Sequence, residues 1–213
     1  MTRNHRIRRG LYALTPDHLS DDDLFFRVEA ALSGGISMLQ YRDKIRPTDQ
    51  KIKIAVKLVA LCRHFNVPFI MNDSVEMALA VKADGVHLGK EDGSLFEARK
   101  SLGDGKILGA SCYADFWRAQ KAYLEGADYV AFGAVCSSPT KPHAIYAPLS
   151  LLRHCKNELP LPICAIGGIT LVAAPEIIAA GADMLAVITD LFDAPDISAR
   201  VNAYRQLFDG EVL

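Results

Sequence analysis

The segment Gly126-Ala127-Asp128-Tyr129-Val130-Ala131-Phe132-Gly133-Ala134-Val135 predicts the architecture of this chain. Its last seven residues, 129–135, form an apolar run typical of a buried strand, and Gly126 is typical of the turn that ends a helix. The same turn recurs as Gly181-Ala182-Asp183 before a second apolar run, and more loosely as Ala83-Asp84-Gly85. This recurrence predicts tandem units in which each helix ends in a turn that leads to the next strand.

Eight pairs of strand and helix follow one another along the chain. The expected strands cover residues 11–15, 36–42, 68–72, 85–89, 107–111, 129–135, 161–166 and 184–188. The expected helices cover residues 21–32, 47–60, 75–81, 95–102, 115–125, 149–156, 172–180 and 197–208. Because the strands are apolar on both faces, they are typical of a parallel sheet covered by helices. We therefore expect an α/β fold, a closed (β/α)8 TIM barrel, with a doubly wound sheet as the alternative.

No linker or low-complexity segment divides the chain, so residues 11–213 are expected to form a single barrel domain. Residues 1–10 are rich in arginine and are expected to form a flexible basic arm. The apolar piece 11–14 is too short for a signal peptide or a membrane span. The five cysteines show no Cys-x-x-Cys spacing and are typical of reduced thiols.

The formal net charge of −1 gives no reason to expect nucleic acid as a partner. With half of the residues hydrophobic, the chain has enough apolar side chains for a sizeable core. We expect a cytoplasmic protein that binds small molecules, with neither nucleic acid nor a membrane as partner. The sequence allows a homo-oligomer without predicting one.

In such a barrel, function belongs to the C-terminal ends of the strands. The second strand ends in Gln40-Tyr41-Arg42-Asp43-Lys44, and strand alternation sends Gln40, Arg42 and Lys44 to one side. The sixth strand is followed by Ser137-Ser138-Pro139-Thr140-Lys141-Pro142. Because arginine and lysine neutralise phosphate oxygens directly, the two ends together favour an oligophosphate site. Taken alone, Arg42 could pair with Asp43 or with a loop carboxylate, and the proline-rich segment could be a surface turn.

Carboxylates follow the third and fourth strands, at Asp73 and Asp92. Mg²⁺ is commonly bound by one or two carboxylates together with substrate phosphates. Beside the cations of the second and sixth strands, the two aspartates favour a metal-bridged pyrophosphate. The competing interpretation is that they only cap the helices that begin near Ser74 and Ser94.

The ends of the seventh and eighth strands have the features of a monophosphate site. Gly167-Gly168 precedes a helix and exposes backbone N–H groups, and Thr189 follows the eighth strand. The loops after strands seven and eight are the usual phosphate site of such barrels. The sequence therefore predicts two anion sites on one end of the barrel.

Other chemistry-bearing residues have simpler interpretations. Ser111 ends the fifth strand but lacks the Gly-x-Ser-x-Gly elbow of a hydrolase. Cys112 and Cys136 are expected to be small side chains within the core rather than nucleophiles. His87 lies inside an apolar strand and is expected to be a core histidine with its hydrogen bonds satisfied.

From about residue 11 to residue 191, the chain resembles the thiamine phosphate synthase family. The motifs that carry the resemblance are Gln40-Tyr41-Arg42-Asp43-Lys44, Asn72-Asp73, Asp84-Gly85-Val86-His87-Leu88-Gly89, Ser138-Pro139-Thr140-Lys141-Pro142 and Ala165-Ile166-Gly167-Gly168-Ile169. Each motif is weak alone, but their order is specific. The resemblance implies a TIM-barrel transferase that uses Mg²⁺. The implied reaction joins hydroxymethylpyrimidine pyrophosphate to thiazole phosphate, or to its carboxylated form, with release of pyrophosphate.

The resemblance also implies a role for individual positions. The residues implied to hold the pyrimidine pyrophosphate are Gln40, Tyr41, Arg42, Asp43, Lys44, Asn72, Ser111 and Lys141, and those implied to act in catalysis are Arg42, Lys44, Ser111 and Lys141. Asp73 and Asp92 are implied to hold Mg²⁺. The residues implied around the thiazole phosphate are Ser138, Pro139, Thr140, Gly168, Ile188 and Thr189. The chain departs from the family pattern at Lys90, at Cys112-Tyr113 and in the loop 144–149, where a common glycine is missing.

The implied mechanism is a substitution at the pyrimidine methylene, in which pyrophosphate leaves and the thiazole nitrogen attacks. A dissociative path is plausible because the aminopyrimidine ring stabilises a cation. The alternatives are a thiazole tautomerase, which needs only the monophosphate side, and a non-catalytic sensor of thiamine intermediates. The sequence does not choose between the plain and the carboxylated thiazole, or fix the metal or the order of substrates.

Overall fold

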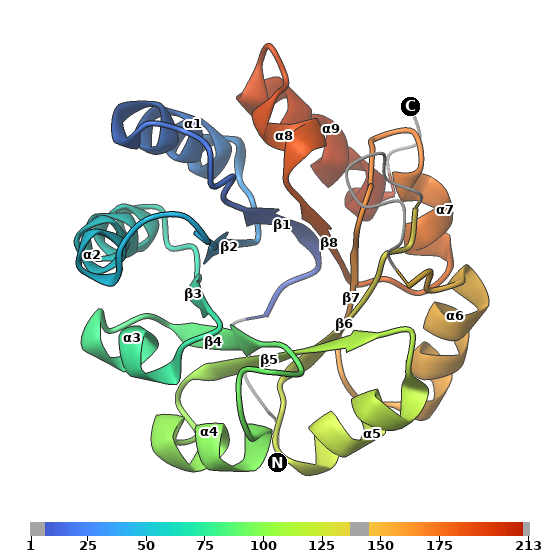
Figure 1. Ribbon diagram of the computed structural model, residues 1–213. Coiled ribbons are helices and arrows are strands. Elements are labelled where there is room, and N and C mark those ends of the chain that lie inside the picture. The colour runs from blue at the N-terminus through green and yellow to red at the C-terminus, as the bar shows by residue number, and fades with distance from the viewer. Residues whose placement is uncertain (1–6, 137–144, 211–213) are drawn as a thin grey trace.

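A computed structural model of the chain describes residues 7–136 and 145–210. Its strands form a closed barrel in which every neighbouring pair is parallel and β8 returns to β1, with Tyr12 opposite Ala186 (Figure 1). The strands are β1 Gly10–Leu14, β2 Met38–Tyr41, β3 Phe69–Asn72, β4 Gly85–Leu88, β5 Ile107–Tyr113, β6 Tyr129–Phe132, β7 Ile163–Ile166 and β8 Met184–Val187. The prediction of a (β/α)8 barrel is confirmed.

The helices form a ring outside the strands (Figure 1). They are α1 Asp21–Gly34, α2 Thr48–His64, α3 Val75–Ala80, α4 Leu95–Leu102, α5 Phe116–Leu124, α6 Leu149–Glu158, α7 Ala174–Ala179, α8 Thr189–Phe192 and α9 Ile197–Asp209. The short helix α8 was not expected, because its four residues lie between the predicted last strand and the predicted last helix. Strand β6 is also shorter than predicted, ending at Phe132 rather than at Val135.

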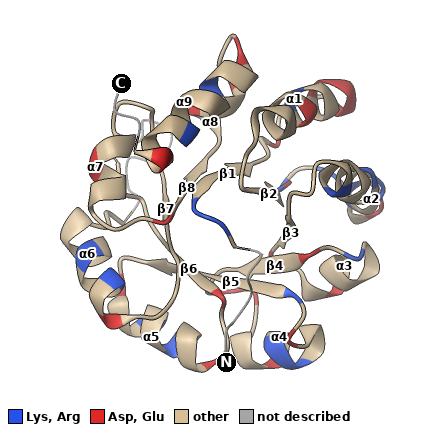
Figure 2. Ribbon diagram, turned by 180° about the vertical axis from the view of Figure 1, so that it is seen from behind, with Lys and Arg blue, Asp and Glu red and all other residues tan. Residues whose placement is uncertain are grey.

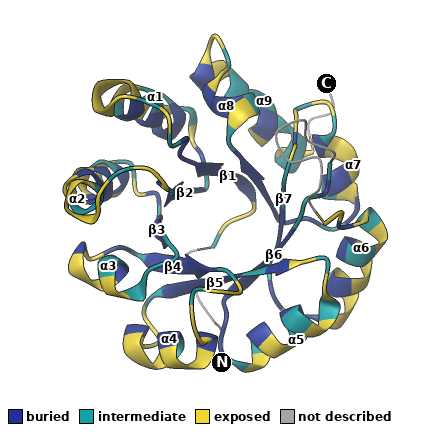
Figure 3. Ribbon diagram, viewed as in Figure 1, coloured by how far each residue is buried: buried dark blue, intermediate teal, exposed yellow. Residues whose placement is uncertain are grey.

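Two separate hydrophobic clusters follow from the alternation of the strands. One side of each strand faces the barrel interior, where Tyr12, Met38 and Ile70 belong to the inner cluster. The other side faces the helices, where Leu11, Leu39 and Phe69 belong to the larger outer cluster. Figure 3 shows the result, with buried strands and helices that are buried on their inner faces and exposed on their outer faces.

The aspartates that recur in the sequence, Asp84, Asp128 and Asp183, bind the N-terminal ends of the strands through pairs of hydrogen bonds. In each case the aspartate N–H donates to a carbonyl near the start of the preceding strand, and its carboxylate accepts the N–H of the same residue, at 2.7–3.0 Å. The pairs are Asp84 with Phe69, Asp128 with Leu108, and Asp183 with Ile163. Gly126 and Gly181 adopt the left-handed conformation at the helix ends. The interpretation of these segments as helix-ending turns that lead to strands is confirmed.

We expect Asp128→Ala to lower the free energy of unfolding by about 3 kcal/mol, because it removes the acceptor of a buried backbone N–H and of the half-buried Arg99 guanidinium. The Asp128 carboxylate is buried and accepts from Arg99 at 2.5 Å as well as from the N–H of Leu108 at 2.8 Å. Urea unfolding measures the change. Asp49→Ala is the matched control, because its exposed pair with Lys53 spans 4.0 Å, and it should stay within about 1 kcal/mol. Equal effects of the two substitutions would contradict the fastening role.

The described part of the predicted basic arm contacts the barrel. Ile7 packs against the inner cluster, Arg9 lies 3.8 Å from the carboxylate of Asp183, and Gly10 already begins β1. Residues 1–6 lie outside the described residues.

In Figure 2 the charged residues lie mainly on the helices and loops, and the strands are almost free of them. Among residues 7–136 and 145–210, no helix combines the length and apolar character that crossing a membrane requires.

Candidate active site

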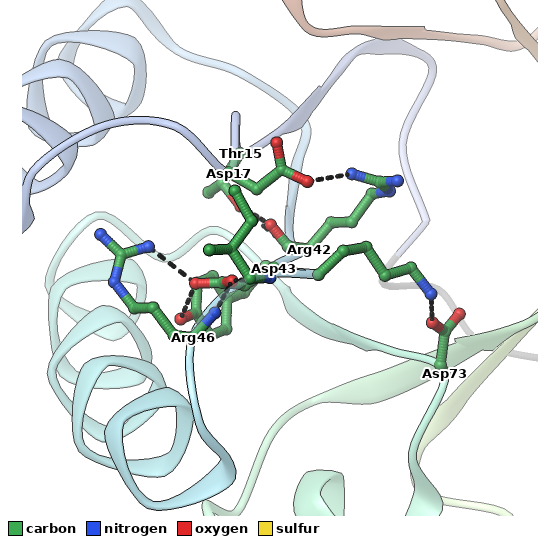
Figure 4. A network of polar contacts seen from close by, with 9 residues as sticks. Thr15, Asp17, Arg42, Asp43, Arg46 and Asp73 are labelled. Carbon is green, nitrogen blue, oxygen red and sulfur yellow. Dashed lines mark hydrogen bonds and ion pairs between the residues drawn. The ribbon is translucent and has the colours of Figure 1, made fainter.

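The end of the barrel formed by the C-terminal ends of the strands, called the mouth below, brings the predicted cations together with carboxylates. Gln40 is buried and turned into the barrel interior, as the alternation of β2 predicted. Arg42 pairs with Asp17 from the loop after β1 at 2.9 Å, and Lys44 pairs with Asp73 at the end of β3 (Figure 4). The two cations of the motif therefore lie at the mouth, each beside a carboxylate of a neighbouring strand end.

The other two members of this motif lie on the opposite side of the strand. Tyr41 belongs to the outer cluster and donates to Asp43 at 3.0 Å. The buried Asp43 accepts from the backbone N–H groups of Ile45 and Arg46 at 2.9 Å and from the Arg46 guanidinium at 2.7 Å (Figure 4). Burial alone would raise the pKa of Asp43, but the hydrogen bonds from Arg46 and Ile45 lower it to about 2. These side chains hold the loop that presents Lys44.

Thr15, the residue that follows β1, holds the backbone of the same region through hydrogen bonds. Its hydroxyl donates to the carbonyl of Arg42 at 3.0 Å and accepts the N–H of Arg42 at 2.9 Å. The backbone N–H of Thr15 donates to the carbonyl of Gln40 at 3.0 Å. The position of Arg42 is thus fixed by its backbone, and its guanidinium remains at the mouth.

Asp73 and Asp92 come together at the ends of β3 and β4, and neither caps a helix. Ser74 caps α3 and Ser94 caps α4 through their hydroxyls. The Asp92 carboxylate accepts the N–H of Gly89 at 2.7 Å. Burial, and then the neighbouring Asp73 carboxylate, raise the pKa of Asp92 against the opposing N–H of Gly89. Two adjacent carboxylates whose negative charges repel are the kind of pair that a divalent cation stabilises.

This pair fits a cation that takes its remaining ligands from elsewhere. Within the described ranges, no three His, Cys, Asp or Glu side chains come together as a ready-made metal site. Mg²⁺ does not need such a group, because it commonly takes one or two carboxylates and completes its shell with water and phosphate oxygens. Asp73 has a positive φ of 65°, an uncommon conformation that aspartate tolerates, and its N–H donates to the carbonyl of His87 at 2.9 Å.

Asn72 and Ser111 lie on the strands that flank His87: Asn72 ends β3, whereas Ser111 lies within β5, which continues to Tyr113. Asn72 is half-buried and lies opposite His87 in the register of β3 and β4. The Ser111 hydroxyl lies 2.8 Å from Nε2 of His87, whose Nδ1 lies 2.9 Å from the hydroxyl of Tyr129. The prediction that His87 is a core histidine with satisfied hydrogen bonds is confirmed. Cys112 is also a core residue, and burial raises its pKa to about 12.

The predicted monophosphate residues lie at the ends of β7 and β8. Gly167 and Gly168 have φ values of 101° and 66°, and a Cβ on Gly167 would lie 2.6 Å from Cβ of Ala134. Only glycine therefore fits this turn. Ile188 precedes α8, and Thr189 is its first residue. The remaining predicted residues, Ser138, Pro139, Thr140 and Lys141, lie outside the described residues.

Reasoning from the sequence did not single out three polar residues of this region. Asp17 follows Pro16 in a loop, where it carries no motif, and its role appears only through its ion pair with Arg42. Tyr12 and Tyr129 lie in apolar strands, and their sequence context is typical of core residues. Their hydroxyls are nevertheless hydrogen-bonded to each other at 2.8 Å inside the barrel. Their inward register was the available signal, because a buried tyrosine usually needs a partner for its hydroxyl.

Comparison with known proteins assigns the chain to a family. A family model described as thiamine monophosphate synthase matches residues 11–191. The chain belongs to the thiamine monophosphate synthase family. A thiamine-phosphate synthase from Aromatoleum aromaticum is 55% identical over 201 residues, which make up 94% of this chain and 97% of the relative. One from Thiobacillus denitrificans is 48% identical over 202 residues, or 95% of this chain and 96% of the relative.

A solved structure agrees with the thiamine monophosphate synthase assignment. The thiamine phosphate pyrophosphorylase from Pyrococcus furiosus matches with a TM-score of 0.86 and 32% sequence identity. The match covers 99% of this chain and 100% of that chain. The family resemblance predicted from the ordered motifs is thereby confirmed over nearly the whole barrel.

In this member of the thiamine monophosphate synthase family, His87 should make stability depend on pH. Burial lowers the pKa of His87 from 6.5 to about 4. Below pH 6.5 the unfolded chain therefore binds a proton at this position that the folded chain does not, so stability falls as the pH falls. Between pH 7 and pH 5 we expect this residue to lower the free energy of unfolding by about 2 kcal/mol. Urea unfolding of the wild type and of His87→Gln measures it; equal losses in both proteins would contradict the prediction.

Proposed function

We propose that this chain condenses 4-amino-2-methyl-5-hydroxymethylpyrimidine pyrophosphate with 4-methyl-5-hydroxyethylthiazole phosphate, forming thiamine phosphate and pyrophosphate. The observation that carries the proposal is the meeting of Lys44, Asp73 and Asp92 beside Arg42 at the mouth. Cations and paired carboxylates in one place suit a metal-bound pyrophosphate, because the carboxylates would hold Mg²⁺ and the metal would add positive charge for the phosphate groups. Membership of the family and the names of its curated relatives support the same reaction.

The pyrophosphate side of the proposed site is built on β2, β3 and β5, together with Lys141, which follows β6 in the sequence. Its contact residues are Gln40, Arg42, Lys44, Asn72, Ser111 and Lys141. Asp73 and Asp92 would hold Mg²⁺, which supplies positive charge to the pyrophosphate when it is bound. The side chains of Tyr41 and Asp43 face the outer layer, so a contact between these two residues and the substrate would come from their backbone.

The thiazole phosphate side is built on β7 and β8. Gly168, Ile188 and Thr189 would surround the phosphate, and the segment Ser138-Pro139-Thr140 would border the ring. The Gly167-Gly168 turn supports this assignment, because residues that have no side chain of their own can leave backbone N–H groups accessible to phosphate oxygens. All of these residues follow the C-terminal ends of parallel strands, so both substrates would meet at the same mouth.

In the proposed reaction the bond between the pyrimidine methylene and the pyrophosphate oxygen breaks, and a bond from the thiazole nitrogen to that carbon forms. The electron pair of the broken bond leaves with pyrophosphate, where Arg42, Lys44 and Lys141 would stabilise it. The attacking nitrogen carries a lone pair and no proton, so no general base is needed. The protein's contribution would be to stabilise the leaving group and to hold the thiazole in line with the carbon. We propose a cytoplasmic location, where such small phosphorylated substrates are found.

The test is chromatography of the products formed by the purified full-length chain with both substrates and Mg²⁺. Thiamine phosphate should appear only when both substrates are present. Conversion of thiazole carboxylate phosphate into its tautomer, without thiamine phosphate, would instead identify a tautomerase. Binding of the pyrimidine pyrophosphate without any product would identify a sensor, and either result would overturn the proposal.

A further inference from the structure

A continuous row of hydrogen bonds crosses the barrel interior from β2 to β5. The Gln40 amide nitrogen lies 2.7 Å from the Tyr12 hydroxyl, which lies 2.8 Å from the Tyr129 hydroxyl. The Tyr129 hydroxyl lies 2.9 Å from Nδ1 of His87, and Nε2 of His87 lies 2.8 Å from the Ser111 hydroxyl. The row therefore joins two proposed substrate contacts, Gln40 and Ser111, through three residues that the proposed function does not use.

The three middle residues are held firmly by their surroundings. Tyr12 and Tyr129 are 1% and 0% exposed and meet edge to face with ring centroids 5.9 Å apart. The His87 ring stacks on Tyr129 at 5.5 Å. Gly109 makes this arrangement possible, because a Cβ at that position would lie 2.1 Å from the Tyr129 ring. These close contacts prevent the three side chains from adopting other rotamers.

Gln40, at one end of the row, determines which group donates and which accepts in each of the following hydrogen bonds. The Gln40 amide nitrogen has no lone pair to offer, so it donates to the Tyr12 oxygen. The single proton of Tyr12 then goes to the Tyr129 oxygen, and the proton of Tyr129 goes to Nδ1 of His87. Since Nδ1 accepts, the imidazole carries its proton on Nε2 and donates it to the Ser111 oxygen.

The opposite direction leaves a buried donor without an acceptor. If Nδ1 of His87 donated to Tyr129, then Tyr129 would donate to Tyr12, and the Tyr12 oxygen would receive two protons. The hydroxyl proton of Tyr12 would then have no acceptor among the hydrogen bonds of the described residues. An imidazolium form of His87 meets the same obstacle, because its Nδ1 also donates. A buried hydroxyl proton without an acceptor loses its hydrogen bond to water on folding and gains none in return, so this direction is disfavoured.

We propose that Tyr12, Tyr129 and His87 are positioning residues that keep the Ser111 hydroxyl proton directed away from the barrel interior and available to the substrate. Ser111 receives a proton from His87, so its own proton is free to bind an acceptor atom of the pyrimidine pyrophosphate. This role rests on the proposed function, whereas the direction of the row is a property of the free protein. The two can be tested separately.

The first experiment measures the tautomer of His87 in the free protein. Proton–nitrogen correlation spectra of full-length protein labelled with ¹⁵N-histidine distinguish a proton on Nε2 from one on Nδ1, and His87→Gln identifies the signal. We expect the proton on Nε2 at neutral pH. A proton on Nδ1 would overturn the proposed direction. Because no substrate is present, this result does not depend on the synthase activity.

The second experiment is a double-mutant cycle between Tyr129→Phe and Ser111→Ala, read as kcat/KM for the pyrimidine pyrophosphate. Tyr129→Phe should lower kcat/KM about tenfold, the value of roughly one hydrogen bond, and should have less than about a twofold effect when Ser111 is already alanine. The same tenfold loss in both backgrounds, or no loss in either, would overturn the positioning role. If Tyr129→Phe does not fold, Tyr12→Phe interrupts the same row. Tyr204→Phe is the matched control, because its buried hydroxyl binds Asp190 outside the barrel, and it should leave kcat/KM unchanged.

Discussion

Asp92→Asn is expected to lower kcat by about 100-fold or more, because it removes one of two carboxylates proposed to hold the metal beside the leaving pyrophosphate. Asparagine has the shape of aspartate and keeps an oxygen to accept the N–H of Gly89, so the loop should retain its conformation. The cap of α4 is also unaffected, since Ser94 provides it. The loss therefore reports on charge rather than on folding. Steady-state kinetics over a range of Mg²⁺ concentrations measures it.

The matched control for this substitution is Glu91→Gln. Glu91 is the exposed carboxylate next in the chain to Asp92 and undergoes the same change from acid to amide. We expect it to leave both kcat and the Mg²⁺ requirement within about twofold of the wild type. Wild-type turnover with an unchanged Mg²⁺ requirement in Asp92→Asn would rule out this aspartate as a metal ligand.

Lys141→Ala should lower kcat by ~100-fold or more, as is typical when one preorganised charge donor is lost. In the proposed reaction, negative charge grows on the pyrophosphate oxygen as the carbon–oxygen bond breaks. A lysine placed to bind that oxygen stabilises the transition state more than the bound substrate, so kcat should fall more than KM rises. Rapid-quench measurement of pyrophosphate release in a single turnover isolates this step.

Lys90→Ala is the control for the loss of a lysine near the mouth. Lys90 is exposed, follows β4, and has no role in the proposed site. Its removal changes the net charge by the same amount and should alter kcat by less than about threefold. Turnover near the wild-type value in Lys141→Ala would show that Lys141 does not stabilise the leaving group.

The order of elements could be predicted because the local signals are repeated. The aspartates before β4, β6 and β8 mark each junction, and in the structure each one binds the backbone of the preceding strand. The alternation of β2 correctly separated Gln40, which faces the interior, from Tyr41, which faces the helices. These features depend on neighbours in sequence, and such patterns can be read without a structure.

The partners of the polar residues could not be predicted, because they lie far apart in sequence. Tyr12 and Tyr129 are separated by 117 positions. Their inward register indicates that each hydroxyl needs a partner, but nothing local to either residue identifies that partner. The sequence allowed Arg42 to pair with Asp43 or with a loop carboxylate, and the structure shows that its partner is Asp17, a loop residue 25 positions away that nothing local identifies. The alternative that Asp73 and Asp92 only cap helices could also be tested only in the structure, which shows that the neighbouring serines provide the caps.

The measurement that tests this account most directly is the amount of pyrophosphate and thiamine phosphate formed by the wild-type chain, with Mg²⁺ and with EDTA. We predict equal amounts of the two products in Mg²⁺, no turnover in EDTA, and recovery when Mg²⁺ is restored. Turnover at the same rate in EDTA would contradict the role of the Asp73 and Asp92 pair. The absence of thiamine phosphate from a reaction that contains both substrates and Mg²⁺ would contradict the proposed function itself.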